Sequence, residues 1–332
     1  MHPIERMKRR RLLGSRLFAV GALAALGYRA RLKRPRADLR GKVALVSGGS
    51  RGLGLLIARE LYREGCKIAI CARDRVELAR AHEDLVQRGA DVLALHCDVM
   101  DREQCERLVE LVRANFGAID LLVNNAGIIQ VGPIESMTIG DFERAMQTNF
   151  WGAVYLTMAV LPEMRRRRAG RIANITSIGG TVAVPHLLPY ECAKFAEVGF
   201  SEGLHAELAK DNVIVTTVVP GMMRTGSTEH ALFKGRHDRE LGWFHAGATQ
   251  PFTSMNAVRA ARRIVLAIRR GEAEVTLGWQ ARLLRLVHAL APGLTADLFG
   301  QLNRLLPSGD GASSRLAVSG RTLEAGQPHA AH

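Results

Sequence analysis

The pair of residues with the clearest chemical meaning is Tyr190 and Lys194, which stand four positions apart in the stretch YECAK. The residues that follow are typical of a helix, and on a helix positions i and i+4 lie on the same face. A phenol has a pKa of about 10, too high for efficient proton exchange at neutral pH, and a nearby ammonium group stabilises its anion. The pair therefore predicts a proton-transferring tyrosine, provided that the rest of the chain builds a site around it.

A glycine-rich turn, SGGSRGLG at 47–54, lies between a short apolar run and a helical pattern. Its glycines, Gly48, Gly52 and Gly54, let the backbone turn tightly and leave room for a pyrophosphate over the positive end of the helix. Their G-x-x-x-G-x-G spacing differs from the G-x-G-x-x-G of the general dinucleotide fingerprint. The position between a strand and a helix nevertheless favours dinucleotide binding over a purely structural turn.

From residue 42 onward, short runs rich in β-branched residues alternate with longer helical patterns. Several runs are apolar at nearly every position, which is typical of strands buried on both faces of a parallel sheet. The alternation predicts an α/β fold with a doubly wound parallel sheet of the Rossmann type, in one domain over residues 39–280. The expected strands are residues 42–47, 67–72, 91–97, 119–125, 170–177, 213–220 and 274–278.

Further motifs follow the glycine turn in order: NNAG at 124–127, Asn149, Ser177, and then Tyr190 with Lys194. With this set the sequence resembles the short-chain dehydrogenase/reductase family over about residues 40–280. The resemblance implies that Tyr190 exchanges a proton with the substrate oxygen while a hydride moves between a nicotinamide and the substrate carbon. It also implies that Ser177 holds that oxygen, that Lys194 grips the nicotinamide ribose, and that Asn149 holds a water linking Lys194 to solvent.

The same resemblance implies where the cofactor lies. Asp98 would contact the adenine, and Thr225, in PGMMRT at 220–225, would contact the carboxamide. The implied cofactor contacts are Gly48, Ser50, Arg51, Gly52, Leu53, Gly54, Arg73, Asp98, Val99, Asn125, Ala126, Gly127, Tyr190, Lys194, Pro220, Gly221 and Thr225.

The end of the second expected strand bears on the choice between NAD and NADP. Selectivity for NAD rests on an acidic side chain there, and this sequence has Ala72 instead, followed by Arg73. Arg51 lies inside the glycine turn, so two guanidinium groups can meet a 2′-phosphate with bidentate geometry, and we expect NADP. NAD remains the alternative because Asp74 comes one step later, and solvated loop charges are the ordinary role of such arginines.

The composition excludes some classes of site. Five scattered cysteines without a CxxC pair argue against a disulfide framework or a metal site, and favour buried thiols in a reducing compartment. The net charge is +14, but residues 1–42 hold 13 of the Lys and Arg residues against two acids. Because this arm lacks interleaved aromatic residues, we expect no nucleic-acid partner.

Within the arm, residues 12–28 form an apolar run flanked by basic residues. The pattern predicts a membrane anchor or an interfacial helix over residues 1–38. A cleaved export signal, and packing on the protein itself or on a partner subunit, are the alternatives. Residues 281–307 predict two amphipathic helical segments around Pro292, and the small polar residues of 308–332 indicate disorder.

The segment from about 222 to 255 is where the resembled family builds a lid over its substrate. Its aromatic side chains suit an apolar ligand, or else pack the lid against the core; they are Phe233, Trp243, Phe244 and Phe252.

Together these features predict an NADP-dependent oxidoreductase that interconverts a ketone and a secondary alcohol on a hydrophobic substrate, such as a lipid, a 3-oxoacyl compound or a steroid. A non-catalytic NADP-binding scaffold at a membrane and an NAD-dependent alcohol dehydrogenase are the alternatives. The resemblance implies a homo-oligomer, dimer or tetramer. The arm predicts membrane association with the catalytic domain in the cytoplasm, and a soluble cytoplasmic protein is the alternative.

Overall fold

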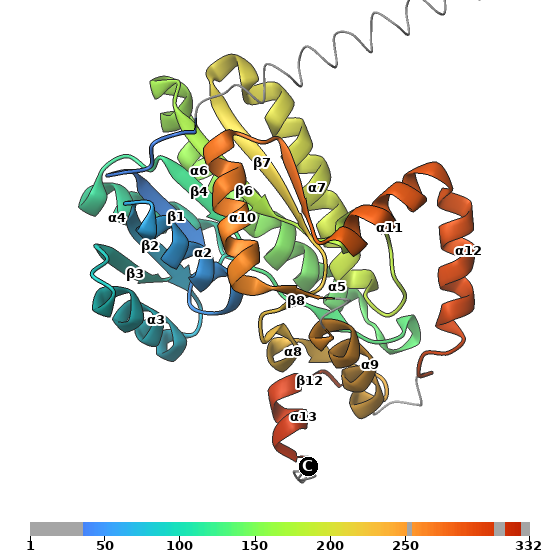
Figure 1. The fold of residues 1–332 in the computed structure, drawn as a ribbon. Coiled ribbons are helices and arrows are strands. Elements are labelled where there is room, and N and C mark those ends of the chain that lie inside the picture. The colour runs from blue at the N-terminus through green and yellow to red at the C-terminus, as the bar shows by residue number, and fades with distance from the viewer. Residues whose placement is uncertain (1–35, 251–253, 309–315, 327–332) are drawn as a thin grey trace, which may run out of the picture.

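A parallel sheet of seven strands forms the centre of the protein (Figure 1) in the order β11-β7-β6-β4-β1-β2-β3. The structure, a computed structural model, describes residues 36–250, 254–308 and 316–326. The expected α/β sheet is confirmed. Its strands are β1 Val43–Ser47, β2 Lys67–Ala72, β3 Val92–His96, β4 Leu121–Asn124, β6 Gly170–Ile175, β7 Val213–Pro220 and β11 Glu274–Leu277.

Helices cover both faces of this sheet (Figure 1), because alternate residues of each strand point to opposite sides. In β1, Ala44 and Val46 belong to the core cluster on one side, whereas Val43 and Leu45 belong to the cluster on the other. The first side is covered by α2 Gly52–Arg63, α3 Arg75–Gln87 and α10 Ala257–Arg270, and the second by α4 Arg102–Phe116, α6 Gly152–Arg167 and α7 Leu188–Leu208.

The strand order reverses at the centre of the sheet, where β1 lies between β2 and β4. The chain first adds β2 and β3 on one side of β1, and then adds β4, β6, β7 and β11 on the other. In open α/β sheets the loops at the carboxyl ends of the strands separate at such a point and leave room for a ligand. The glycine turn at 47–54 follows β1 and therefore lies at this point.

The segment after β7 folds into several short elements instead of an open loop. Of its aromatic residues, Phe233 and Phe244 are 0 % and 5 % exposed, in a cluster with Val131 and Leu241. They therefore pack this segment against the protein, while Phe252 lies outside the described residues. The elements are β8 Met223–Arg224, α8 Ser227–His230, β9 Leu232–Phe233, α9 His237–Thr249 and β10 Met255–Asn256, and β9 also pairs with β5 Gln130–Val131.

Beyond β11 the chain forms two helices, α11 Trp279–Leu290 and α12 Pro292–Asn303, which stand out from the body of the protein (Figure 1). The expectation of disorder over 308–332 is wrong for part of that stretch. Residues 318–326 form β12 Val318–Ser319, antiparallel to β9, and α13 Gly320–Gly326. Composition alone missed these elements because contacts with the distant α8 and β9 hold them.

Two other expectations have different outcomes. The apolar run at 12–28 lies outside the described residues, and no helix among those described is long and apolar enough to cross a membrane. Four cysteines are buried as expected, but Cys192 is exposed because it lies on the outer side of α7. In the described part of the chain, no group of His, Cys, Asp or Glu is arranged to hold a metal ion.

Candidate active site

The sheet and α7 bring Ser177, Tyr190 and Lys194 together. Ser177 follows the carboxyl end of β6, and its hydroxyl lies near enough to that of Tyr190 to lower the pKa of the phenol. α7 begins at Leu188 with Pro189 in its first turn, where the fixed φ of proline suits a helix start. One turn further, the Lys194 ammonium lies 5.9 Å from the centre of the Tyr190 ring. The predicted proton-transfer pair thus shares one face of α7 with the predicted substrate-positioning serine beside it.

Two buried acceptors fix the Lys194 ammonium. Its Nζ donates to the Ile175 carbonyl at 2.9 Å and to Oε2 of Glu197 at 2.7 Å. Lys194 is 4 % exposed and Glu197 is 2 % exposed. Burial lowers the pKa of Lys194, but Glu197 and Tyr190 raise it by more, so the group stays charged. With two of its three N–H groups used in this way, one remains for a ligand.

The Tyr190 hydroxyl differs from the expectation of a lowered pKa. Burial raises its pKa, and Lys194 together with the Ser177 hydroxyl lowers it by less. Glu197 and Glu191 add to the rise. The lysine acts in the predicted direction, but the sequence did not reveal how far the phenol is buried or that two carboxyl groups lie nearby. In this state the phenol keeps its proton and can donate it.

Asn149 lies in a single π-helical turn, Gln147–Trp151, between α5 Ile139–Met146 and α6. Its Oδ1 accepts from the Ile128 N–H at 3.0 Å, and its Nδ2 donates to the carbonyls of Ile128 and Ala145. A Cβ on Gly127 would lie 2.5 Å from Asn149 Oδ1 and 3.8 Å from Lys194 Nζ, so the asparagine and the lysine are neighbours. π turns are common at functional sites, and this one brings Asn149 beside Lys194, the lysine predicted to act in catalysis.

The NNAG motif holds the glycine turn in place. Asn125 donates from Nδ2 to the carbonyls of Ser47 and Gly48, both at 3.1 Å. The Ser47 hydroxyl accepts from the backbone N–H groups of Asn125 and Ala126. Ser47 was not among the predicted site residues, although its place between the first strand and Gly48 was a signal.

The glycine turn fits a dinucleotide. A Cβ on Gly54 would lie 2.2 Å from the Gly48 carbonyl oxygen, so only glycine allows this tight turn. Gly52 has φ +51°, and a Cβ there would meet only Thr225 atoms, at 3.5 Å or more. Gly52 and Thr225 are therefore close neighbours, which places the glycine turn beside the segment after β7 that carries the predicted carboxamide contact.

The other predicted cofactor residues surround this region, and their contacts with a cofactor remain predictions. Ser50 and Leu53 are buried within the turn, Pro220 is the last residue of β7, and Gly221 follows it. Val99 is buried against Gly152 at the start of α6. Asp98 accepts from the Met100 N–H at 3.0 Å.

Charged residues gather around the first turn of α3. Arg51 pairs with Glu77, and Arg73 Nη1 lies 3.8 Å from Asp98 Oδ2. Asp74, the residue that kept NAD open as an alternative, caps α3 by accepting from the N–H groups of residues 76 and 77. Its carboxylate is therefore engaged as a helix cap.

Glu191, beside the catalytic tyrosine, was missed by the sequence analysis. It is 2 % exposed, and its Oε1 accepts from the Val184 N–H at 2.6 Å. Oε2 is buried without a hydrogen-bond partner among the described residues. Burial raises the pKa of this carboxyl to about 8. Nothing in its sequence position indicated burial, whereas Glu197, three residues after Lys194, could have been recognised as an ion-pair partner on the same helix face.

Comparison with known proteins identifies this arrangement. The sequence profile described as short chain dehydrogenase matches residues 42–233. The chain belongs to the short-chain dehydrogenase/reductase family. It is 37 % identical over 251 residues to a dehydrogenase/reductase SDR family protein 7-like from Anopheles gambiae, covering 74 % of this chain and 77 % of the relative.

Two solved members of the family have similar structures. A short-chain dehydrogenase from Streptomyces avermitilis has a TM-score of 0.69 and 29 % identity, covering 79 % of this chain and 97 % of its own. An actinorhodin polyketide ketoreductase solved with NADPH has a TM-score of 0.64 and 30 % identity, covering 71 % of this chain and 94 % of its own. As a short-chain dehydrogenase/reductase, this chain is an oxidoreductase that uses a nicotinamide cofactor.

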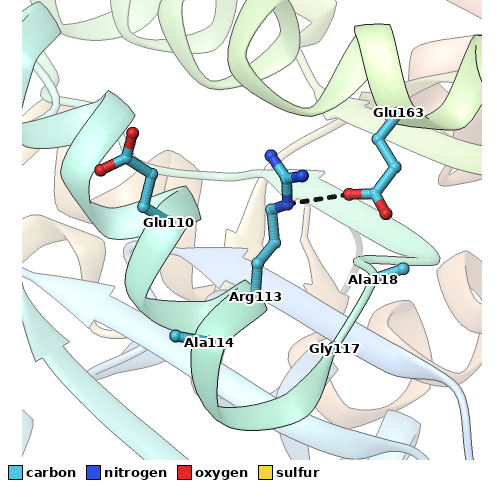
Figure 2. A pocket seen from close by; sticks show the side chains of 6 residues that line it. All are labelled: Glu110, Arg113, Ala114, Gly117, Ala118 and Glu163. Atoms are coloured by element: carbon cyan, nitrogen blue, oxygen red, sulfur yellow. Dashed lines mark ion pairs between the residues drawn. The ribbon is translucent and has the colours of Figure 1, made fainter.

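A hollow of about 520 Å³ lies on the surface of this short-chain dehydrogenase/reductase between the end of α4 and α6 (Figure 2). Arg113 and Glu163 form an ion pair of 2.9 Å across it. None of the catalytic residues lines it, so we do not assign it to the substrate. It is lined by Glu110, Arg113, Ala114, Gly117, Ala118 and Glu163.

Proposed function

We propose that this short-chain dehydrogenase/reductase uses NADP(H) to interconvert a ketone and a secondary alcohol on a hydrophobic small molecule. The observation that carries the proposal is the neighbouring pair of hydroxyl groups of Ser177 and Tyr190 beside the buried, charged Lys194. Two adjacent hydroxyl groups can both bond to one carbonyl oxygen, and one of them has a proton to give. This is the arrangement that a ketone needs while it is reduced.

The residues divide the work between them. When bound, the nicotinamide exchanges a hydride with the substrate carbon. Ser177 holds the substrate oxygen, and Tyr190 gives it a proton in reduction or takes one in oxidation. Lys194 stabilises negative charge on Tyr190 after the proton leaves, and its remaining N–H is available to the nicotinamide ribose. Asn149 would link Lys194 to solvent through a water, so that the proton can be replaced.

Three features support NADP over NAD. Ala72 leaves the end of β2 without a carboxylate, and Asp74 is engaged as the cap of α3. Arg51 pairs with Glu77 in the first turn of α3, and Arg73, directly after β2, lies near Asp98, so two guanidinium groups lie next to where the adenosine ribose of a dinucleotide lies in this fold. The polyketide ketoreductase of similar fold was solved with NADPH.

Membrane association of the enzyme on the cytoplasmic side is also part of the proposal. The apolar run at 12–28, with its basic flanks, has the composition of a segment that enters the lipid boundary. α11 and α12 add exposed leucines, which suit a poorly soluble substrate or a lipid surface. These side chains, each at least 51 % exposed, are Leu283, Leu286, Leu290, Leu294 and Leu298.

A homo-oligomer is proposed on a separate surface. Trp151 and Met158, at the start and in the middle of the α6 region, are 41 % and 57 % exposed, and Phe195 on α7 is 43 % exposed. Large apolar side chains on the outer side of two helices favour a contact with a second copy of the chain.

A substrate panel tests the proposed activity. Purified enzyme is offered 3-oxoacyl thioesters, ketosteroids and short polar ketones with NADPH and NADH in parallel, and cofactor oxidation is followed by absorbance. We expect turnover of at least one hydrophobic ketone, faster with NADPH than with NADH. Turnover of only the short polar ketones, or equal rates with both cofactors, would contradict the corresponding part of the proposal.

A further inference from the structure

Glu77, in the first turn of α3, lies near basic side chains from three distant parts of the chain. Its Oε2 pairs with Arg51 of the glycine turn. Its Oε1 lies 3.3 Å from Nη2 of Arg321, in α13, and 4.0 Å from Nε2 of His230, in α8. Arg321 therefore reaches the rim of the glycine turn from a position 270 residues further along the chain.

The fold fixes the position of Arg321. Its neighbour Gly320 donates its N–H to the Ala231 carbonyl at 3.0 Å. A Cβ on Gly320 would lie 2.0 Å from the Thr228 carbonyl oxygen, so only glycine allows this approach of α13 to α8. On the preceding residues, β12 pairs with β9. Residues 318–321 are thus held against α8 and β9, which fixes the position of Arg321.

Two guanidinium groups meet at this point, with the carboxylates of Glu77 and Asp74 near them. Arg51 and Arg321 share the single carboxylate of Glu77, while both side chains stay accessible, at 46 % and 61 % exposure. Hydrogen bonds from the first turn of α3 lower the pKa of Asp74, and the charges of Arg51 and Arg321 lower it further. Burial lowers the pKa of His230, and Arg51 lowers it further. In both cases the charges of Arg51 and Arg321 act in the same direction as the main cause, which places both guanidinium groups near the first turn of α3.

We propose that Arg321 binds the 2′-phosphate of NADP(H) together with Arg51, which makes residues 316–326 part of the cofactor site. The inference rests on the proposed use of NADP(H). A phosphate has the oxygens and the charge to replace the Glu77 carboxylate as the partner of both guanidinium groups. Glu77 then competes with the cofactor, because it occupies the arginines in the free enzyme and repels the phosphate. NADH lacks this phosphate and gains nothing from Arg321.

Binding titrations of NADPH and NADH, followed by nicotinamide fluorescence, test this without any substrate. Arg321→Ala is expected to weaken NADPH binding at least about tenfold and to change NADH binding less than about twofold. Arg321→Lys, which keeps the charge without the planar fork, is expected to fall between wild type and Arg321→Ala. Arg102→Ala is the matched control, since Arg102 is exposed on α4 and pairs with Glu106.

Glu77→Gln gives the opposite sign. It frees Arg51 and Arg321 and removes a negative charge, so NADPH should bind more tightly while NADH is little affected; loss of a merely structural contact would not produce such a gain. The inference is overturned if wild type prefers NADPH and Arg321→Ala keeps that preference, which would leave the proposed cofactor intact. If Arg321→Ala weakens the binding of NADPH and NADH equally, the inference is also overturned, because α13 then only supports α8. A wild type without preference for NADPH would refute the proposed cofactor and this inference together.

Discussion

At the scale of single residues, the proton chemistry depends on the charges that surround Tyr190. Lys194 stabilises the phenolate, while burial and the carboxyl groups of Glu197 and Glu191 favour the neutral phenol. A neutral phenol beside Ser177 is poised to protonate a substrate oxygen, which is the reductive direction. Oxidation needs the phenolate, so we expect the rate of oxidation to increase more than the rate of reduction as the pH rises.

Tyr190→Phe and Lys194→Ala should each abolish turnover. The phenylalanine variant lacks the exchangeable proton, while its dinucleotide contacts remain, so NADPH should still bind it with nearly wild-type affinity. Steady-state rates with a substrate from the panel, together with NADPH titrations, check both statements. Wild-type turnover by Tyr190→Phe would refute the assigned mechanism.

Arg51→Ala combined with Arg73→Ala should narrow the preference for NADPH over NADH by at least about tenfold, equivalent to about 1.4 kcal/mol. The reason is that Arg51, beside the first turn of α3, and Arg73, directly after β2, can both bind a 2′-phosphate. The ratio of the two dissociation constants measures the effect, with Arg102→Ala as control. An unchanged ratio would mean that these two arginines do not bind the 2′-phosphate.

Glu197→Leu should destabilise the protein by about 3 kcal/mol, because it leaves the buried ammonium of Lys194 without its counter-charge. Denaturant unfolding of the variant and of wild type measures the difference. Adding Lys194→Met to Glu197→Leu should recover part of the loss, since the double variant buries no charge. No recovery in the double variant would mean that lost packing, not the unpaired charge, causes the destabilisation.

At the scale of elements, the loop between Ser177 and α7 is held by buried carboxyl groups. Glu191 accepts from the Val184 N–H, and Glu240 of α9 lies 2.9 Å from Nδ1 of His186. The Trp243 indole also donates to Glu240, at 2.6 Å. The loop before α7 is therefore held both by α7 itself and by the segment after β7.

Glu191 makes the stability of this loop depend on pH. Its pKa is raised from 4.5 to about 8 in the folded protein, so the folded state binds this proton more tightly than the unfolded chain. The stabilising contribution of the protonated Glu191 carboxyl is therefore fully present below the pKa of the unfolded chain, 4.5, and is lost as the pH rises through about 8. Between pH 5 and pH 8 the loss amounts to about 3 kcal/mol.

Glu191→Gln should remove this loss, because glutamine keeps the acceptor oxygen for Val184 and has no proton to lose. The free energy of unfolding is measured for both proteins at pH 5 and pH 8. The stability of the variant relative to wild type should increase from pH 5 to pH 8. Glu202→Gln, at an exposed position of the same helix, is the control and should follow wild type. If Glu191→Gln and wild type change in parallel, the carboxyl of Glu191 is already ionised at pH 5.

At the scale of the whole molecule, charge is divided unevenly between the catalytic domain and its N-terminal arm. The arm, residues 1–42, carries a net charge of +11 out of +14. Arginines at the end of α6 are taken up by acids of the domain, since Arg165 pairs with Asp211 and Arg167 with Asp120. The arm is therefore the main candidate for contact with anionic lipid.

Deletion of residues 1–35 should release the enzyme from membranes. We expect the full-length protein to sediment with membranes and to bind vesicles containing anionic lipid, because an apolar run with basic flanks enters the lipid boundary. The shortened protein should stay in the supernatant. The proposed location would be contradicted if the full-length protein is soluble without detergent and does not bind vesicles that contain anionic lipid.

The sequence by itself determined the sheet and the family, and it placed the predicted catalytic residues in order along the chain. Strand runs show as apolar segments, and Gly48, Ser177, Tyr190 and Lys194 stand in motifs whose chemistry depends on local spacing. Burial and contacts between distant segments were decided only by the tertiary structure. The raised pKa of Tyr190, the burial of Glu191 and the approach of Arg321 to Glu77 all result from such contacts. Residues 318–326 look disordered when read alone because their composition is small and polar, yet they are ordered by β9 and α8, about 90 residues earlier in the chain.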